Sequence, residues 1–100
     1  MSNSAEPVAV VTGAGRGIGL AVARRLAAGG VRVAVLSRTE ANAEAAAAAI
    51  NEENPGRAQA YAVDVADGEA MVEVGKRILA DFSKVSILVN NAGIARDNLV

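Results

Sequence analysis

The residues best suited to chemistry in this chain form a glycine-rich turn, Thr12-Gly13-Ala14-Gly15-Arg16-Gly17-Ile18-Gly19. An apolar run from Val8 to Val11 leads into the turn, and apolar residues at helical spacing follow it. Glycine lets the backbone approach a ligand closely, and the start of a helix offers unpaired N–H groups and the positive end of a dipole. The turn therefore predicts a binding site for a phosphate group.

The composition excludes several other kinds of site. Because the chain has no Cys and no His, it lacks thiolate metal ligands, disulfides and the commonest general base, and we predict no metal site. The net charge of -1 comes without any block of like charge, which argues against nucleic acid or a membrane surface as partner. No apolar run reaches the roughly 18 residues of a membrane span. The start has no secretory signal, so we expect a cytoplasmic location, or an organellar matrix after removal of a transit peptide.

The rest of the chain predicts strands alternating with helices. Mostly apolar runs, typical of parallel strands buried on both faces, extend from Val8 to Val11, Val31 to Leu36, Ala60 to Val65 and Ser86 to Val89, and the first of them is unbroken. Helical spacing or a capping residue predicts three helices, one carrying Ile18, Val22 and Leu26, one capped by Thr39 and one capped by Asp67. Right-handed crossovers then give an α/β fold, the first half of a Rossmann-type doubly wound parallel sheet with strand order 3-2-1-4.

Two common glycine templates do not fit the turn. A P-loop needs Gly-Lys followed by Ser or Thr, but Ile18-Gly19-Leu20 occupies those positions. The dinucleotide pattern G-x-G-x-x-G fails as well, because its last glycine would fall on Ile18 or on Leu20. The spacing present is Thr-Gly-x-x-x-Gly-x-Gly, from Thr12 to Gly19.

This spacing, with Asp64-Val65 after the third strand and Asn90-Asn91-Ala92-Gly93 after the fourth, resembles the short-chain dehydrogenases/reductases. The stretch from Gly93 to Leu99 is most similar to the 3-oxoacyl-[acyl-carrier-protein] reductases of fatty acid biosynthesis. The resemblance implies an NADP-dependent oxidoreductase that reduces a 3-oxoacyl thioester, carried on acyl carrier protein, to the 3-hydroxyacyl form. It also implies a homotetramer.

The resemblance implies a set of cofactor-binding residues. Asp64 would bind the adenine amino group beside the Val65 backbone, with a turn or helix-cap role for Asp64 as the alternative. Asn91 would line the adenosine ribose, whereas Asn90 would tie the central strands together. The complete predicted set is Gly13, Ala14, Gly15, Arg16, Gly17, Ile18, Gly19, Ser37, Arg38, Asp64, Val65, Asn91, Ala92 and Gly93.

The choice between NAD and NADP depends on the end of the second strand. NAD enzymes place an acidic residue about 20 residues beyond the glycines, where it binds the ribose hydroxyls. Here that position is Ser37, followed by Arg38. A guanidinium binds phosphate in a bidentate manner, and Arg16 can reach the same group from the glycine turn. We therefore predict NADP(H), the alternative being that both arginines are solvated surface charges.

No catalytic residue is predicted within the chain. The family carries out hydride transfer with a Tyr, a Lys four residues later and a Ser, but Tyr61 lies in a predicted strand and residue 65 is Val. We expect residues 1–100 to be the cofactor-binding half of a single Rossmann domain and inactive alone. Two alternatives remain: a short-chain reductase of another ketone or alcohol, and a non-catalytic Rossmann-like nucleotide-binding module. Ser83 and Ser86 depart from the family pattern, in which Gly and Asp are usual.

Overall fold

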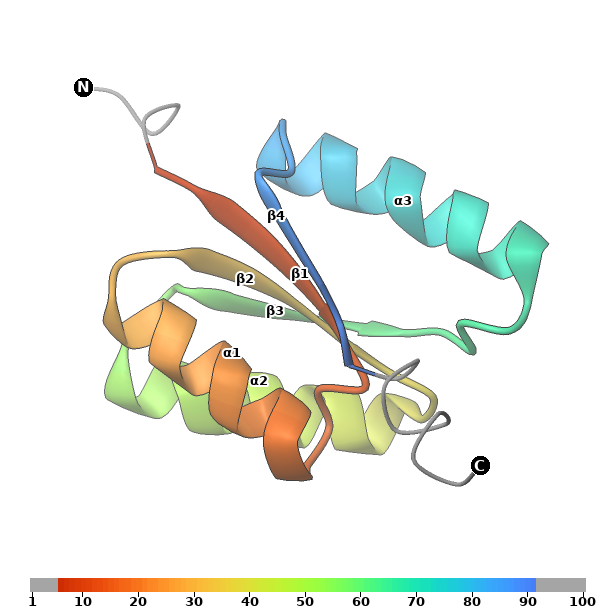
Figure 1. Ribbon diagram of the computed structural model, residues 1–100. Coiled ribbons are helices and arrows are strands. Elements are labelled where there is room, and N and C mark those ends of the chain that lie inside the picture. Colours follow the sequence, from red (N-terminus) through yellow and green to blue (C-terminus); the bar gives the residue numbers. More distant parts are fainter. Residues whose placement is uncertain (1–5, 92–100) are drawn as a thin grey trace.

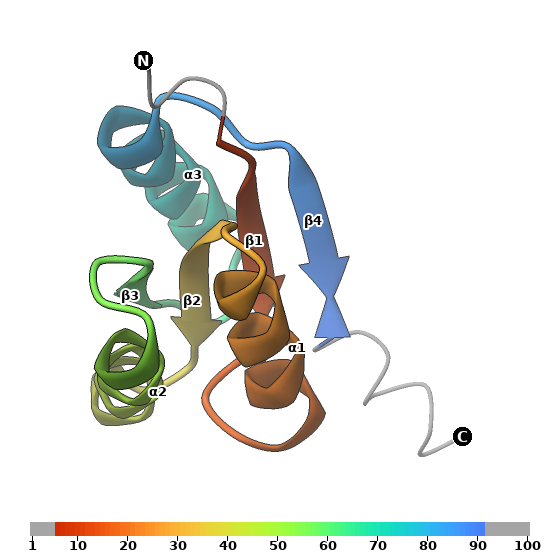
Figure 2. The same cartoon turned by 90° about the vertical axis from the view of Figure 1, so that its left-hand side faces the viewer.

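A computed structural model describes residues 6–91, which form a parallel sheet with helices on both faces (Figure 1). Within these residues the elements are β1 (Val8–Thr12), α1 (Gly17–Ala28), β2 (Arg32–Ser37), α2 (Glu40–Glu53), β3 (Ala58–Ala62), α3 (Gly68–Phe82) and β4 (Ile87–Asn90). All strand pairs are parallel, and their order is β3-β2-β1-β4 (Figure 2). The predicted α/β fold and strand order are confirmed.

Side chains of the two central strands alternate between two cores, because successive residues of a strand point to opposite faces. Ala9, Val11, Val33 and Val35 pack against α1 and α2, whereas Val8, Val10, Ala34 and Leu36 pack against α3. Figure 1 shows α1 and α2 together on one side of the sheet and α3 on the other. Burial on both faces explains why the sequences of these strands are mostly apolar and do not alternate between apolar and polar residues.

The buried face of α1 differs from the predicted stripe. Ile18 is 72% exposed, and the fully buried residues are Gly19, Ala23 and Ala27. Small side chains let the helix backbone lie close to the sheet, so the buried face follows residue size rather than hydrophobicity. In α2 the alanine run behaves as predicted, since Ala43, Ala46, Ala47 and Ile50 are its buried residues.

Both predicted helix caps are present. The Thr39 hydroxyl accepts a hydrogen bond from the Asn42 backbone N–H at 3.2 Å, and the Asp67 carboxylate accepts one from the Ala70 N–H at 3.1 Å. Each cap satisfies an N–H group that has no partner inside its helix. Thr39 and Asp67 therefore mark the starts of α2 and α3, as predicted.

β3 begins and ends earlier than predicted. The Asn51 side chain accepts from the Ala58 N–H at 2.8 Å and donates to the Ala58 carbonyl at 2.9 Å, which holds the start of the strand. At the other end the Asp64 carboxylate accepts from the Ala66 N–H at 2.9 Å and turns the chain. The prediction of a strand reaching Val65 is wrong because this local turn replaces the strand ladder.

Polar side chains join β1 to β4. The Thr12 hydroxyl donates to the Asn90 side-chain oxygen at 3.2 Å, in agreement with the strand-tying role predicted for Asn90. At the opposite end of the pair the Ser86 hydroxyl accepts from the Val8 N–H at 3.2 Å. Ser86 thus supplies a hydrogen-bond acceptor just before β4 begins.

Candidate cofactor-binding cleft

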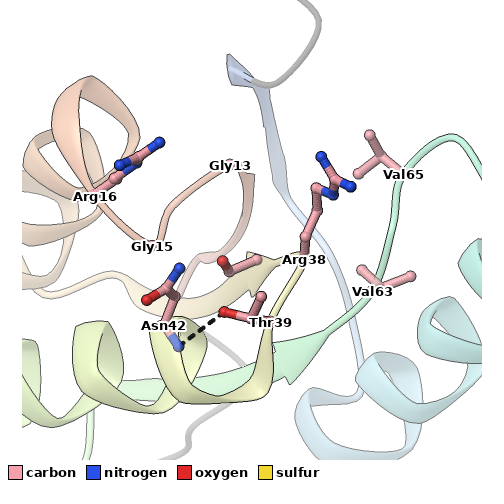
Figure 3. A pocket seen from close by; sticks show the side chains of 9 residues that line it. Gly13, Gly15, Arg16, Arg38, Thr39, Asn42, Val63 and Val65 are labelled. Carbon is pink, nitrogen blue, oxygen red and sulfur yellow. Dashed lines mark hydrogen bonds between the residues drawn. The ribbon is translucent and has the colours of Figure 1, made fainter.

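A cleft of about 440 Å³ lies at the carboxyl ends of β1, β2 and β3. In a doubly wound sheet, ligands bind at this edge, beside the strand where the direction of winding reverses. β1 is that strand, because β2 and β4 lie on its two sides. The residues that line the cleft are Gly13, Gly15, Arg16, Ser37, Arg38, Thr39, Asn42, Val63 and Val65 (Figure 3).

The glycine turn depends on left-handed backbone at two positions. Gly13 has φ 62° and Gly17 has φ 63°, a region that side chains disfavour. Between them the Ala14 N–H donates to the Leu36 carbonyl at 2.9 Å. This bond holds the turn against the end of β2, so the turn and the residues after β2 form opposite walls of one cleft.

Gly19 is required for space rather than for backbone conformation. A Cβ added at Gly19 would overlap the Gly13 carbonyl oxygen and lie 2.8 Å from the Asn91 side-chain nitrogen. That Asn91 nitrogen donates to the same Gly13 carbonyl at 3.2 Å. The start of α1, the turn and the end of β4 are therefore packed together through a residue without a side chain.

The start of α1 is open to an anion. Its N-cap residue, Arg16, makes no side-chain capping bond, and the first turn contains no acidic residue. By contrast, α2 and α3 each have a side-chain cap and an acidic residue, Glu40 or Glu69, in the first turn. The unpaired N–H groups and positive dipole end of α1 are thus available to a phosphate.

The cleft is positively charged. Of the residues that line it within the described range 6–91, two are arginines and none is acidic. Figure 3 shows Arg16 and Arg38 on opposite sides of Gly13. Neither guanidinium forms an ion pair with a carboxylate of residues 6–91. Two exposed cations facing one cleft favour a multiply charged anion such as a phosphate monoester.

The structure places the other predicted residues around the cleft rather than all within it. Ile18 is exposed at the start of α1, and Asn91 contacts the glycine turn. Asp64 is exposed and forms its own turn, while the flanking Val63 and Val65 line the cleft. The alternation between Val63 and Asp64 continues that of β3, and Val65 lies in the turn that follows. Ala92 and Gly93 lie outside the described residues.

Three lining residues were missing from the predicted site: Thr39, Asn42 and Val63. The sequence indicates only a helix-capping role for Thr39. Asn42 lies in the first turn of the helix that Thr39 caps. Because that helix starts at the same edge of the sheet as the cleft, the sequence in principle places Asn42 near it. Val63 follows from the alternation around Asp64.

Tyr61 lies in β3, as predicted, and has a structural role. Its side chain is 1% exposed, and its hydroxyl donates to the Asp81 carboxylate of α3. Burial, together with this hydrogen bond and the negative charge of Asp81, raises the pKa of Tyr61. A phenol held in this way cannot act on a ligand in the cleft.

The described residues fit a dinucleotide better than a metal ion. No cluster of His, Cys, Asp and Glu capable of holding a metal occurs among residues 6–91. The same range contains no helix long and apolar enough to cross a membrane. The glycine turn offers backbone N–H groups, the arginines offer charge, and Val63 and Val65 offer an apolar wall. Phosphates and an aromatic base are the groups that such a set can hold.

Comparison with known sequences identifies relatives along nearly the whole chain. The family model for short chain dehydrogenases matches residues 7–100. The chain is 47% identical over 97 residues to the short-chain reductase protein NovJ of Streptomyces niveus, covering 97% of this chain and 37% of NovJ. It is 43% identical over 93 residues to the 3-oxoacyl-[acyl-carrier-protein] reductase FabG of Escherichia coli K12, covering 93% of this chain and 36% of FabG. The chain thus spans little more than a third of either relative.

Solved structures include similar folds with either cofactor. A metagenomic short-chain oxidoreductase in complex with NADP matches with a TM-score of 0.76 and 35% identity, over 82% of this chain and 37% of that one. An NAD+-bound xylitol dehydrogenase matches with a TM-score of 0.78 and 38% identity, over 82% of this chain and 31% of that one. Overall similarity therefore leaves the choice of cofactor to the residues of the cleft.

Proposed function

This chain belongs to the short-chain dehydrogenase family, and we propose that its cleft binds NADP(H) to support reduction of a carbonyl group by the full-length protein. The observation that carries the proposal is the charge of the cleft: Arg16 and Arg38 line it, and no acidic residue does within the described part of the chain. In an NAD site a carboxylate near Ser37 would bind the ribose hydroxyls and repel a 2′-phosphate. With a serine there, no carboxylate lines the cleft within the described part of the chain to repel a phosphate.

Each part of the cleft would bind a different part of the cofactor. The backbone N–H groups from Gly13 to Gly19 would bind the pyrophosphate at the start of α1. Arg16 and Arg38 would bind the 2′-phosphate, and Val63 and Val65 would pack against the adenine. Asp64 would bind the adenine amino group, and Asn91 with Ala92 and Gly93 would line the adenosine ribose. Held by these residues, NADPH would supply the hydride for reduction of a carbonyl group.

For the substrate we propose a 3-oxoacyl thioester carried on acyl carrier protein. The 43% identity to the Escherichia coli reductase that acts on this class supports it, as does the stretch from Gly93 to Leu99. A homotetrameric, cytoplasmic enzyme is part of this proposal. The second candidate is a reductase of another ketone, which the 47% identity to the short-chain reductase NovJ favours. NADPH oxidation by the full-length protein, with a 3-oxoacyl thioester or with unrelated ketones, separates the two.

The cofactor proposal is tested by replacing Arg38 with Asp. We expect Arg38→Asp to weaken NADPH binding by about 100-fold, because a charge-assisted bond is lost and a repulsion is added. NADH binding should change by no more than about 3-fold, since the repelled phosphate is absent from NADH. Titration calorimetry on the full-length protein measures both affinities.

Arg25→Asp is the matched control. Arg25 lies in the last turn of α1, at the end of the helix away from the cleft, and undergoes the same change of charge. It should leave both affinities nearly unchanged. Equal affinities for NADPH and NADH, in the starting protein and in Arg38→Asp alike, would overturn the assignment of NADP(H).

A further inference from the structure

Three segments of the cleft meet at Gly15. Unlike Gly13 and Gly17, Gly15 has no positive φ, so its backbone conformation is open to other residues. A side chain there would press on its neighbours: a Cβ would lie 2.6 Å from the Ser37 hydroxyl oxygen, which a rotation of Ser37 would relieve, and 3.0 Å from the Asn42 Cβ. The surface over Gly15 is therefore formed by side chains from the end of β2 and from the first turn of α2.

Asn42 is held in place by the cap of α2. Its backbone N–H donates to the Thr39 hydroxyl at 3.2 Å, and the next N–H, that of Ala43, donates to the Thr39 carbonyl at 3.0 Å. Figure 3 shows the Asn42 side chain rising from α2 toward Gly15, with its amide at the cleft. The amide thus lies on a rigid element between the two walls that carry Arg16 and Arg38.

The polar side chains of the cleft differ in whether they already form hydrogen bonds within the protein. The Thr39 hydroxyl is occupied by helix capping. The Asn42 side-chain amide makes no hydrogen bond within the described range, and neither does the Ser37 hydroxyl. Asn42 therefore offers two N–H donors at the start of a helix, where the dipole favours an anion.

We propose that Asn42 is a specificity-determining residue that donates a hydrogen bond to the ribose 2′-phosphate of NADP(H), beside Ser37 and Arg38. The proposal rests on the binding of NADP(H) in the cleft. Bonds to a charged acceptor are about twice as strong as bonds between neutral groups, so Asn42 would gain more from a phosphate than from a ribose hydroxyl. It would therefore add to the preference for NADP(H) without adding charge.

Two substitutions of Asn42 test this role. Adenosine 2′,5′-bisphosphate and adenosine 5′-monophosphate serve as ligands, because they differ at the 2′ position and need no catalytic residue. By titration calorimetry on the full-length protein, Asn42→Ala should weaken the bisphosphate by about 10-fold and the monophosphate by less than about 2-fold. Asn42→Asp should weaken the bisphosphate by about 100-fold, because a carboxylate replaces the amide at nearly the same volume.

Ala41→Asp is the matched control for charge. Ala41 is exposed in the same helical turn but does not line the cleft. A carboxylate there should weaken the bisphosphate by less than about 3-fold. Folding is monitored by the Tm of each ligand-free variant, which Asn42→Ala should not lower, because the backbone N–H at position 42 still meets the Thr39 cap.

The outcomes separate this role from the cofactor proposal. If the starting protein does not prefer the bisphosphate, NADP(H) binding and the role of Asn42 both fail. If it does, and Arg38→Asp removes the preference while both Asn42 variants retain it, only the role of Asn42 is overturned. Equal weakening of the two nucleotides, or an equal effect of Ala41→Asp, also overturns it.

Discussion

The two faces of the sheet are covered by side chains of different size. On the face of α1 and α2 the buried helix residues are small apart from Ile50: Gly19, Ala23, Ala27, Ala43, Ala46 and Ala47. On the opposite face, in the described part of the chain, one helix presents Val74, Ile78 and Phe82 to large partners that include Tyr61. Backbone therefore lies close to backbone on the first face, and large side chains separate the elements on the second.

The helices also cover the two faces of the sheet to different extents. Beside α3 lies an apolar groove of about 450 Å³, and the large side chains that line it include Val72, Leu79 and Leu88, which are 58%, 53% and 68% exposed. The cleft is built instead from the closely packed face, where the turn, α1 and β4 touch through glycine. In a closely packed region a small change in side-chain volume displaces its neighbours. Positions near the cleft should therefore tolerate substitutions less well than positions on α3.

Gly19→Ala should produce the largest effect. The added methyl group would overlap the Gly13 carbonyl, a backbone atom that cannot move without shifting the turn and its bond to Asn91. We expect a loss of about 3 kcal/mol in the free energy of unfolding, measured by urea denaturation. The same shift should abolish nucleotide binding.

Gly75→Ala on α3 is the control for this substitution. Nothing lies within 4 Å of a Cβ built at Gly75, which is in the middle of the helix. Alanine has the higher helix propensity, so this change should stabilise the protein by about 1 kcal/mol. Similar urea midpoints for Gly19→Ala and the starting protein would show that the close approach at Gly19 is dispensable.

Tyr61→Phe tests the face of the sheet that α3 covers. It removes the hydrogen bond to Asp81 that joins β3 to α3, and it should cost about 2 kcal/mol at neutral pH. Because burial raises the pKa of Tyr61, the folded protein keeps a proton that the unfolded chain loses above pH about 10. Stability is fully present below that pH and should fall by about 1.4 kcal/mol per pH unit above it.

The phenylalanine variant should lack this alkaline loss, as urea midpoints over a pH series would reveal. Tyr61→Phe removes this one phenol, so the difference in tyrosinate absorbance between the starting protein and the variant reports Tyr61. A folded protein whose tyrosinate appears with a midpoint near the ordinary value would contradict the buried hydrogen bond.

Ser83→Gly should have the smallest effect, and a stabilising one. Ser83 ends α3 with φ 77°, the left-handed conformation that glycine adopts without steric cost. We expect a gain of about 1 kcal/mol, seen as a higher Tm. Ser83→Ala keeps the unfavourable Cβ and should give no gain, so equal Tm values for the two variants would point away from backbone strain.

Much of the fold was predictable because its signals are local. Apolar runs identified the strands, and Thr39 and Asp67 marked two helix starts by chemistry confined to one turn. The prediction failed where a distant contact decides the outcome. The buried face of α1 depends on how closely the helix meets the sheet, and the start of β3 depends on the Asn51 side chain.

The site divides in the same way. Spacing alone identified the glycine turn, and residue type alone identified Arg16 and Arg38 as phosphate ligands to be tested. Asn42 was missed, because its place beside Gly15 results from the docking of the turn on the end of β2 through the bond from Ala14 to Leu36. Because that distance depends on how two elements dock, a sequence pattern within one element cannot predict it.

The sequence by itself determined the alternation of strands and helices, the glycine spacing of the turn and the positive charge beside it, since each depends on residue type and local spacing. Only the tertiary structure decided that Gly15 lies against Ser37 and Asn42, and Gly19 against Gly13 and Asn91. Apart from the one between Gly13 and Gly19, these contacts join residues far apart in the chain. Their distances are set by how β1 lies between β2 and β4, and by how closely small side chains let α1 approach the sheet.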